Sequence, residues 1–209
     1  MTTNQKLESN FIRIYEKAIP DKVCDKLIKR LLNPNSNVAK RRNESSHLTS
    51  TDFFLSNNES DHVLRKLYDQ ISSLVKTYLE VYKKDITDDG GGLTLNFCTR
   101  FEQPRIVRYS NKNNVPEKFN DHSDNWSTDS STRQVNIIMY LNDVDEGGAT
   151  VFPYYNLSVK PEKGKLLMFP SFYTYTHRGE VPVSHSKFIL VTWLHFGNET
   201  KYTTYPLMT

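Results

Sequence analysis

The chain has 209 residues, enough to bury a hydrophobic core in one domain or in two small ones. Its 27 basic and 24 acidic residues leave a net charge of +3 without a clustered basic stripe, so we expect no nucleic-acid partner. The first residues lack the apolar segment of a signal peptide, and no apolar run reaches membrane-spanning length, so we expect a cytoplasmic protein without membrane contact. Cys24 and Cys98 match no metal or redox spacing and are expected to be buried as small apolar residues.

The N-terminal part is predicted to contain a strand, a helix and a loop. Residues 11–19 alternate well enough for a strand, and Pro20-Asp21 ends it and offers Asp21 as the N-cap of a helix. That helix has one apolar stripe and stops at Asn33-Pro34. Residues 33–50 are polar and poor in large apolar groups, and we interpret them as an exposed loop, with its basic run at 40–42 solvated.

The rest of the chain is predicted to be one long helix followed by many short strands. The helix runs from about Ser60 or Asp61 to Lys84, with apolar residues at spacings of three and four. After Gly92, turn signals separate short apolar or alternating runs at 93–99, 104–109, 133–141, 149–153, 157–159, 165–169 and 187–196. This pattern predicts a mainly β protein with flanking helices, in which the strands form a sandwich or barrel. We expect a single domain over residues 1–209, with helical support at about 11–84 and a core at about 93–200.

The triplet His122-Ser123-Asp124 is the strongest chemical signal in the chain. Side chains two residues apart lie on the same face of an extended strand. One more imidazole from a distant strand would place three ligands on one side of an octahedral ion, as in the 2-His-1-carboxylate site of non-haem Fe(II) oxygenases. The triplet therefore favours oxidative chemistry with molecular oxygen. His47 and His62 lie in or near polar segments and are expected to face solvent, whereas His195 ends an apolar strand and is expected to be structural.

The downstream sequence carries an ordered set of motifs. From Arg133 they are, in order, Tyr140-Leu-Asn142, Gly147-Gly-Ala-Thr-Val-Phe-Pro153, Lys160-Pro-Glu-Lys-Gly164, His177, Lys187 and Trp193. His177 and Lys187 are ten residues apart, and Trp193 follows six residues later. This ordered set resembles the prolyl 4-hydroxylase group of 2-oxoglutarate- and Fe(II)-dependent dioxygenases. The resemblance is close over about residues 104–196 and loose over the helical N-terminal half.

The resemblance implies a fold, a reaction and a set of site residues. The fold is a double-stranded β-helix, or jelly roll, supported by the N-terminal helices. The reaction hydroxylates a prolyl residue in a peptide or protein, with proline-rich partners among the candidates. It converts 2-oxoglutarate and O₂ to succinate and CO₂, and it uses L-ascorbate as reductant. The implied roles are iron binding by His122, Asp124 and His177; 2-oxoglutarate binding by Lys187, Thr150 and Tyr109; and peptide contact by Arg133 and Trp193. An ammonium is a suitable point-charge anchor for the distal carboxylate of 2-oxoglutarate.

The chain departs from the family pattern around the distal histidine. His185 stands where the family often has glycine, and the segment after His177 reads Arg-Gly-Glu-Val-Pro-Val, as in microbial or viral relatives. His185 also competes with His177 as third ligand, but it lies only two residues from Lys187 on the same strand face, which would crowd iron against the anchor. We therefore favour His177. These departures affect the rim of the site and leave the substrate open.

Two other functions remain compatible with the sequence. One is the same chemistry on a lysyl residue, a free amino acid or a nucleobase, although nucleic-acid demethylases usually anchor 2-oxoglutarate with arginine. The other is a catalytically silent jelly roll that only binds a peptide; such modules commonly lose a metal ligand or the anchor, and here all four positions are filled. The sequence does not indicate the oligomeric state.

Overall fold

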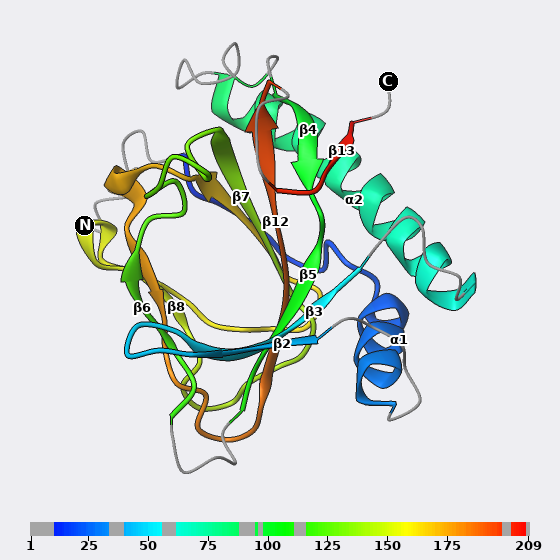
Figure 1. Cartoon of the computed structure of the whole chain (residues 1–209), viewed down its shortest axis with the longest axis vertical. Coiled ribbons are helices and arrows are strands. Elements are labelled where there is room, and N and C mark those ends of the chain that lie inside the picture. Colours follow the sequence, from blue (N-terminus) through cyan, green and yellow to red (C-terminus); the bar gives the residue numbers. More distant parts are fainter. Residues whose placement is uncertain are drawn as a thin grey trace, which may run out of the picture.

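The computed structural model describes residues 11–33, 40–55, 62–87, 95, 98–110, 116–197 and 202–207. Two helices, α1 (Asp21–Leu32) and α2 (His62–Thr87), pack on one side of two antiparallel sheets (Figure 1). The strands are β1 (Arg13–Tyr15), β2 (Lys40–Glu44), β3 (Thr49–Phe54), β4 (Cys98–Glu102), β5 (Arg105–Tyr109), β6 (Phe119–His122), β7 (Arg133–Tyr140), β8 (Thr150–Phe152), β9 (Leu157–Val159), β10 (Leu166–Pro170), β11 (His177–Gly179), β12 (Lys187–Phe196) and β13 (Thr204–Pro206). The single-turn 3₁₀ helices η1 (Pro153–Tyr155) and η2 (Tyr173–Tyr175) follow β8 and precede β11.

The two sheets face each other as a jelly roll, as the sequence predicted. The large sheet has the order β1-β10-β7-β12-β5-β3-β2, and β4 joins β12 and β13 at its end. The small sheet has the order β6-β11-β8-β9. Figure 1 shows the helices on the outer side of the large sheet, with β6 and β8 on the opposite side. Every strand pair within the described residues is antiparallel.

Strand β12 shows how alternation builds two separate cores. Phe188, Leu190 and Leu194 pack toward the helices, in a cluster that includes most of the buried residues of α1 and α2. Ile189, Val191 and Trp193 point the other way, into the space between the sheets. A central strand that is covered on both faces is expected to be continuously apolar, and β12 is buried over nine of its ten residues. The first cluster is scaffold, while the second surrounds the pocket described below.

The N-terminal region contributes strands as well as helices, which corrects the predicted loop at 33–50. Residues 40–54 form the hairpin β2–β3, and β3 pairs with β5, so the hairpin extends the large sheet. The prediction was wrong because the polar residues of β3 are not solvated: Ser50 and Asp52 are buried and face the pocket. Residues 34–39 lie outside the described part of the chain. The basic run at 40–42 belongs to β2, and Arg41 and Arg42 make ion pairs there.

Helix and strand boundaries differ modestly from the predictions. Helix α1 begins at Asp21, after Pro20, and has no side-chain cap, so the predicted capping role of Asp21 is wrong. Helix α2 extends to Thr87, three residues beyond the predicted end, and β1 is shorter than the predicted strand. Neither helix in the described part of the chain is long and apolar enough to cross a membrane. Both cysteines are buried as expected, and burial raises the pKa of each thiol to about 11.

Candidate metal centre and cosubstrate pocket

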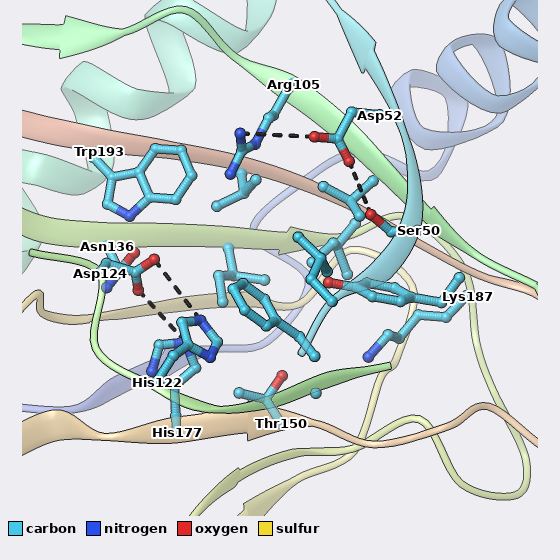
Figure 2. A pocket seen from close by; sticks show the side chains of 18 residues that line it. Ser50, Asp52, Arg105, His122, Asp124, Asn136, Thr150, His177, Lys187 and Trp193 are labelled. Atoms are coloured by element: carbon cyan, nitrogen blue, oxygen red, sulfur yellow. Dashed lines mark hydrogen bonds and ion pairs between the residues drawn. The ribbon is translucent and has the colours of Figure 1, made fainter. Parts of the chain in front are cut away.

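Two histidines and an aspartate converge at one end of the small sheet. His122 is the last residue of β6, and its Cα partner across the sheet is His177, the first residue of β11. Asp124 follows the end of β6 and turns its carboxylate back toward both rings (Figure 2). Its Oδ1 lies 3.9 Å from Nε2 of His122, and its Oδ2 lies 3.5 Å from Nε2 of His177. The three donor atoms lie within 4.8 Å of one another, so a single ion could contact all three.

Backbone carbonyls orient both imidazoles toward this point. Nδ1 of His122 is 2.7 Å from the carbonyl oxygen of Asn120, and Nδ1 of His177 is 3.1 Å from that of Tyr175. A neutral imidazole that donates from Nδ1 keeps the lone pair of Nε2 free, which is how metal-ligating histidines are usually held. Phe119 stacks on His122 with ring centroids 3.4 Å apart and limits rotation of that ring. The two Nε2 atoms therefore face Asp124 as acceptors.

The loop that carries Asp124 is fixed from two sides. The backbone N–H groups of Asp124 and Asn125 donate to the carbonyl oxygen of Ser171, and Nη1 of Arg133 donates to the carbonyl oxygen of Asp124 at 3.2 Å. The side chain is buried, yet within the described residues its Oδ2 has no hydrogen-bond donor. A buried carboxylate oxygen without a donor is costly unless a cation satisfies it. Two neutral imidazoles and this carboxylate fit Fe(II), which accepts nitrogen and oxygen donors on one face.

The electrostatics of the three side chains agree with that fit. Burial, reinforced by neighbouring His177, lowers the pKa of His122 to about 3, so its ring is neutral at pH 7. Burial alone raises the pKa of Asp124, but the imidazoles of His177 and His122 and the guanidinium of Arg133 outweigh it and hold that pKa below its ordinary value. His122 thus presents a lone pair and Asp124 a negative charge, the states in which these groups bind a metal.

A pocket extends from the three ligands into the space between the sheets. Both sheets contribute residues to its walls. Lys187, the first residue of β12, lies at a different end of the pocket from the ligands (Figure 2). Its side chain is 1% exposed. Lys187 thus lines the same cavity as His122, Asp124 and His177, while the roles predicted for these residues stay predictions.

Lys187 is a buried cation without a protein counter-charge. Its Nζ donates to the carbonyl oxygen of Gly148 at 2.7 Å and lies 4.7 Å from the ring centroid of Tyr109. Within the described residues no carboxylate lies at ion-pair distance from it, and burial lowers its pKa to about 7, against a weaker opposing effect of Glu180. An ammonium offers three N–H donors and is expensive to bury unpaired. An anionic ligand in the pocket would supply the missing partner.

The glycine pair Gly147-Gly148 builds the turn that holds this lysine. Gly147 and Gly148 have φ values of 71° and 73°, in the left-handed region that favours glycine. The N–H of Gly148 donates to the carbonyl oxygen of Val181, while its own carbonyl accepts from Lys187. The motif is therefore part of the lysine site as well as a turn.

Thr150 and Tyr109 also line the pocket. Thr150 is on β8, and its Oγ1 accepts a hydrogen bond from the hydroxyl of Tyr140 at 2.8 Å, which leaves the threonine O–H free to donate to another group. Tyr109 is the Cα partner of Lys187 on β5. Burial raises the pKa of Tyr109 above its ordinary range, so its hydroxyl stays protonated. Both residues are placed where they could donate to a ligand held by Lys187.

Arg133 and Trp193 are placed differently from each other. Trp193 lines the pocket, whereas Arg133 is buried behind it, with its guanidinium 3.8 Å from the centroid of the indole ring. Arg133 makes a two-pronged ion pair with Glu102 at 2.8 and 2.7 Å. His195 adds a 3.0 Å contact to the same carboxylate, consistent with its expected structural role. The structure thus does not bring Arg133 into the cavity with the other predicted residues, and its contact with a peptide stays a prediction.

His185 does not join the ligands. It is exposed, and its Nε2 contacts the carbonyl oxygen of Asp143 at the protein surface. The preference for His177 over His185 therefore agrees with the geometry. His47 and His62 are exposed, as expected.

Among the pocket residues absent from the sequence prediction, four have polar or charged side chains: Ser50, Asp52, Arg105 and Asn136. Asn136 lies beside Asp124, and the other three lie together on the opposite wall (Figure 2). Alternation along β5 could have placed Arg105 on the same face as Tyr109, because the two residues are four apart. No local signal identified Ser50 and Asp52, since Ser50 fell at the end of the predicted loop at 33–50 and Asp52 was assigned to no element.

Two histidines and an aspartate that converge beside a pocket in an antiparallel jelly roll are the arrangement typical of non-haem Fe(II) oxygenases. Comparison with known proteins agrees: residues 104–195 match the 2OG-Fe(II) oxygenase superfamily. Over these residues the chain is similar to this superfamily, and the curated proteins that it resembles are prolyl 4-hydroxylases.

Curated relatives come from Arabidopsis thaliana. Probable prolyl 4-hydroxylase 11 is 29% identical over 175 residues, which cover 77% of this chain and 53% of that protein. Probable prolyl 4-hydroxylase 9 is 31% identical over 121 residues, which cover 44% of this chain and 40% of that protein. The chain therefore spans about half the length, or less, of these relatives.

Solved structures of similar fold are also prolyl hydroxylases. The viral collagen prolyl hydroxylase of Paramecium Bursaria Chlorella virus-1, in its 2OG complex, has a TM-score of 0.64 at 18% identity and covers 92% of this chain and 99% of that one. A Pseudomonas putida prolyl-4-hydroxylase has a TM-score of 0.64 at 15% identity, with 92% and 96% covered. A prolyl hydroxylase from Trichoplax adhaerens, in complex with a hypoxia inducible factor peptide fragment, has a TM-score of 0.66 at 17% identity, with 91% and 86% covered. At these identities the likeness establishes the fold alone.

Proposed function

We propose that this chain is a 2-oxoglutarate- and Fe(II)-dependent dioxygenase that hydroxylates prolyl residues of a peptide or protein. Its co-products would be succinate and CO₂, and L-ascorbate would serve as reductant. One observation carries the proposal. Three side chains that could bind a metal from one side share a cavity with a buried ammonium that has no carboxylate at ion-pair distance among the described residues. A structural histidine cluster would not need such an ammonium in the same pocket.

Residues at one end of the pocket would bind the metal, and Lys187 at the other end would bind the cosubstrate. His122, Asp124 and His177 would hold Fe(II) from one side, leaving its other positions open to ligands. When bound, the metal supplies the coupling of 2-oxoglutarate decarboxylation to oxidation of an unactivated C–H bond. Lys187 would bind the distal carboxylate of 2-oxoglutarate in a charge-assisted hydrogen bond.

Other residues would orient the cosubstrate and exclude water. The hydroxyls of Thr150 and Tyr109 would donate to the same carboxylate that Lys187 binds, because both line the pocket near it. Ile138, Ile189 and Val191 line the cavity with apolar surface. That surface limits the water that could compete with these polar contacts. Trp193 would contact the substrate, while Arg133 would position both Trp193 and the Asp124 loop from behind.

A peptide substrate is supported by the relatives rather than by the pocket alone. The similar proteins are named as prolyl 4-hydroxylases, and the Trichoplax structure holds a peptide fragment. The pocket itself is open to the surface, as a site for a protein side chain must be.

Two measurements test the proposal in sequence. Under anaerobic conditions, Fe(II) and 2-oxoglutarate together should give a weak visible charge-transfer band that is absent when either is omitted. On admission of oxygen, proline-containing peptides should gain the mass of one oxygen atom on proline, with one succinate formed per hydroxylation. Absence of the band would overturn the metal and cosubstrate assignment. A band without hydroxyproline, or with oxygen added to lysine, would overturn only the choice of substrate.

A further inference from the structure

Arg105 lies on the pocket wall, and the N–H donors of its guanidinium lack hydrogen-bond acceptors among the described residues. It is the first residue of β5 and packs on Trp193, with its guanidinium carbon 4.7 Å from the ring centroid. Figure 2 shows it between Trp193 and Asp52, and Nη1 lies 3.7 Å from Oδ2 of Asp52. That distance allows an ion pair but exceeds a hydrogen bond. Within the described residues no acceptor takes any of its five N–H donors, and its Nε is buried.

The neighbouring carboxylate is already occupied by other donors. Oδ2 of Asp52 accepts from Arg41 at 2.9 Å, and Oδ1 accepts from Ser50 at 3.1 Å. Two guanidinium groups, those of Arg41 and Arg105, therefore share one carboxylate and leave a net positive charge on this wall. The side chain of Arg105 is 18% exposed and that of Arg41 is 52% exposed, so a ligand can reach them.

The wall continues from the pocket onto the hairpin β2–β3. Arg41 and Asp52 are Cα partners on this hairpin, and Phe54 is the partner of Arg105 on β5. The guanidinium of Arg41 lies 5.3 Å from the ring centroid of Phe54. The pocket face of the sheet thus carries two stacked pairs, Arg105 on Trp193 and Arg41 on Phe54.

We propose that Arg105 binds a carboxylate of the peptide substrate, next to the residue that enters the pocket. The inference rests on the proposed function and adds the chemical class of the substrate: an acidic peptide. The carboxylate belongs to an aspartate or glutamate side chain, or to the C-terminus of the peptide.

The carboxylate is not that of 2-oxoglutarate, because Arg105 and Lys187 are far apart. Val191, the Cα partner of Arg105, is four residues beyond Lys187 on β12. Four residues of a strand span about 13 Å. A five-carbon acid held by Lys187 and directed toward the three ligands does not also reach Arg105.

The experiment offers randomised peptides to the wild-type enzyme and to Arg105→Gln. Two mixtures of N-acetylated peptides with a central proline, one with amidated and one with free C-termini, are incubated with Fe(II), 2-oxoglutarate and oxygen. Hydroxylated products are sequenced by mass spectrometry. Glutamine keeps N–H donors and length but removes the charge. Arg65→Gln, which removes the same charge from an exposed position of α2, is the matched control.

The expected result is a preference for acidic peptides that depends on Arg105. Wild type and Arg65→Gln should hydroxylate acidic peptides about tenfold better than their amide counterparts, and Arg105→Gln should lose this ratio. Enrichment in the amidated mixture indicates a side-chain carboxylate, and enrichment confined to free-acid peptides indicates the C-terminus. In the wild type the ratio should also fall between about 0.05 and about 0.5 M salt, a readout independent of how well the variant folds.

Several outcomes would overturn the inference. Products of the wild type without acidic enrichment would do so, as would an acidic preference that persists in Arg105→Gln. A raised 2-oxoglutarate requirement in Arg105→Gln would place the residue in the cosubstrate site instead. Failure of the proposed function has a different signature: no hydroxyproline in any product of the wild type, while the charge-transfer band is intact.

Discussion

Replacing Lys187 with methionine should weaken 2-oxoglutarate binding and at the same time stabilise the free protein. Methionine fills a similar volume without charge, so the change removes the ammonium without opening a cavity. Lys187 has one hydrogen-bond acceptor among the described residues and no carboxylate at ion-pair distance. The charge of Lys187 therefore destabilises the free protein and would stabilise the complex with a bound anion.

The size of both effects follows from the structure. Burial lowers the pKa of Lys187 from 10.5 to about 7. Since one pKa unit is worth about 1.4 kcal/mol, the charged lysine costs the folded protein up to about 5 kcal/mol. Replacing a buried charge with a packed apolar residue typically recovers about 1–4 kcal/mol, and we expect a gain in that range at pH 7. Losing the partner of a bound carboxylate costs about 3 kcal/mol, which raises the 2-oxoglutarate requirement roughly 100-fold.

The pH dependence of stability gives a further check on this reasoning. The unfolded chain binds more protons at Lys187 than the folded one between pH 7 and 10.5, so the wild-type protein gains stability as pH rises through that range. The advantage of Lys187→Met should therefore be largest below pH 7 and shrink at higher pH.

Urea unfolding without 2-oxoglutarate and titration of succinate formation against 2-oxoglutarate measure the two effects. Added 2-oxoglutarate should stabilise the wild type and leave the variant unchanged. A variant that is less stable than the wild type, or that saturates normally with 2-oxoglutarate, would refute the anchor assignment.

Four other outcomes are expected. Asp124→Asn should abolish both the anaerobic charge-transfer band and succinate formation, and a normal band would exclude Asp124 as a ligand. The apparent KM for 2-oxoglutarate should be flat below pH 7 and rise about tenfold per pH unit above it, because the ammonium of Lys187 binds and the free amine does not; a flat profile to pH 9 would contradict this. Thr150→Val should raise the same KM several-fold, since one hydroxyl donor is lost, and should also lower the Tm by a few degrees, because the buried hydroxyl of Tyr140 loses its acceptor; an unchanged KM would make the role of Thr150 purely structural. Glu102→Gln should cost about 3 kcal/mol in urea unfolding, because it leaves the buried Arg133 without its ion-pair partner; a loss below about 1 kcal/mol would show that the network is dispensable.

The strands that carry the chemistry were predictable because they are apolar and separated by clear turns. β7 and β12 were predicted within a residue of their ends, since both are buried on two faces and show long apolar runs. His122, His177 and Lys187 were found through motif spacing, and the structure brings them together with Asp124. Their roles stay predictions until a metal and cosubstrate are bound.

The hairpin β2–β3 was missed because its chemistry depends on tertiary partners. Asp52 and Ser50 look like loop residues until Arg41 and Arg105, which come from different strands, are placed around them. Arg133 shows the opposite difficulty: sequence order placed it near a substrate, but Glu102, 31 residues earlier, draws its guanidinium behind Trp193. No local pattern contains that pairing, because it arises only when β4 and β7 meet on β12.

The ligand cluster belongs to the small sheet, whereas the lysine belongs to the large one. If Lys187 binds the distal carboxylate of 2-oxoglutarate as proposed, the distance between the two sheets sets the length of the acid that can contact both the ammonium and the metal site. A four-carbon homologue would fall short of the ammonium, and a six-carbon one would have to buckle. On that proposal, the packing of Phe152 against Phe169, one from each sheet, would contribute to discrimination among keto-diacids, and a smaller residue at either position should relax it without changing any polar group.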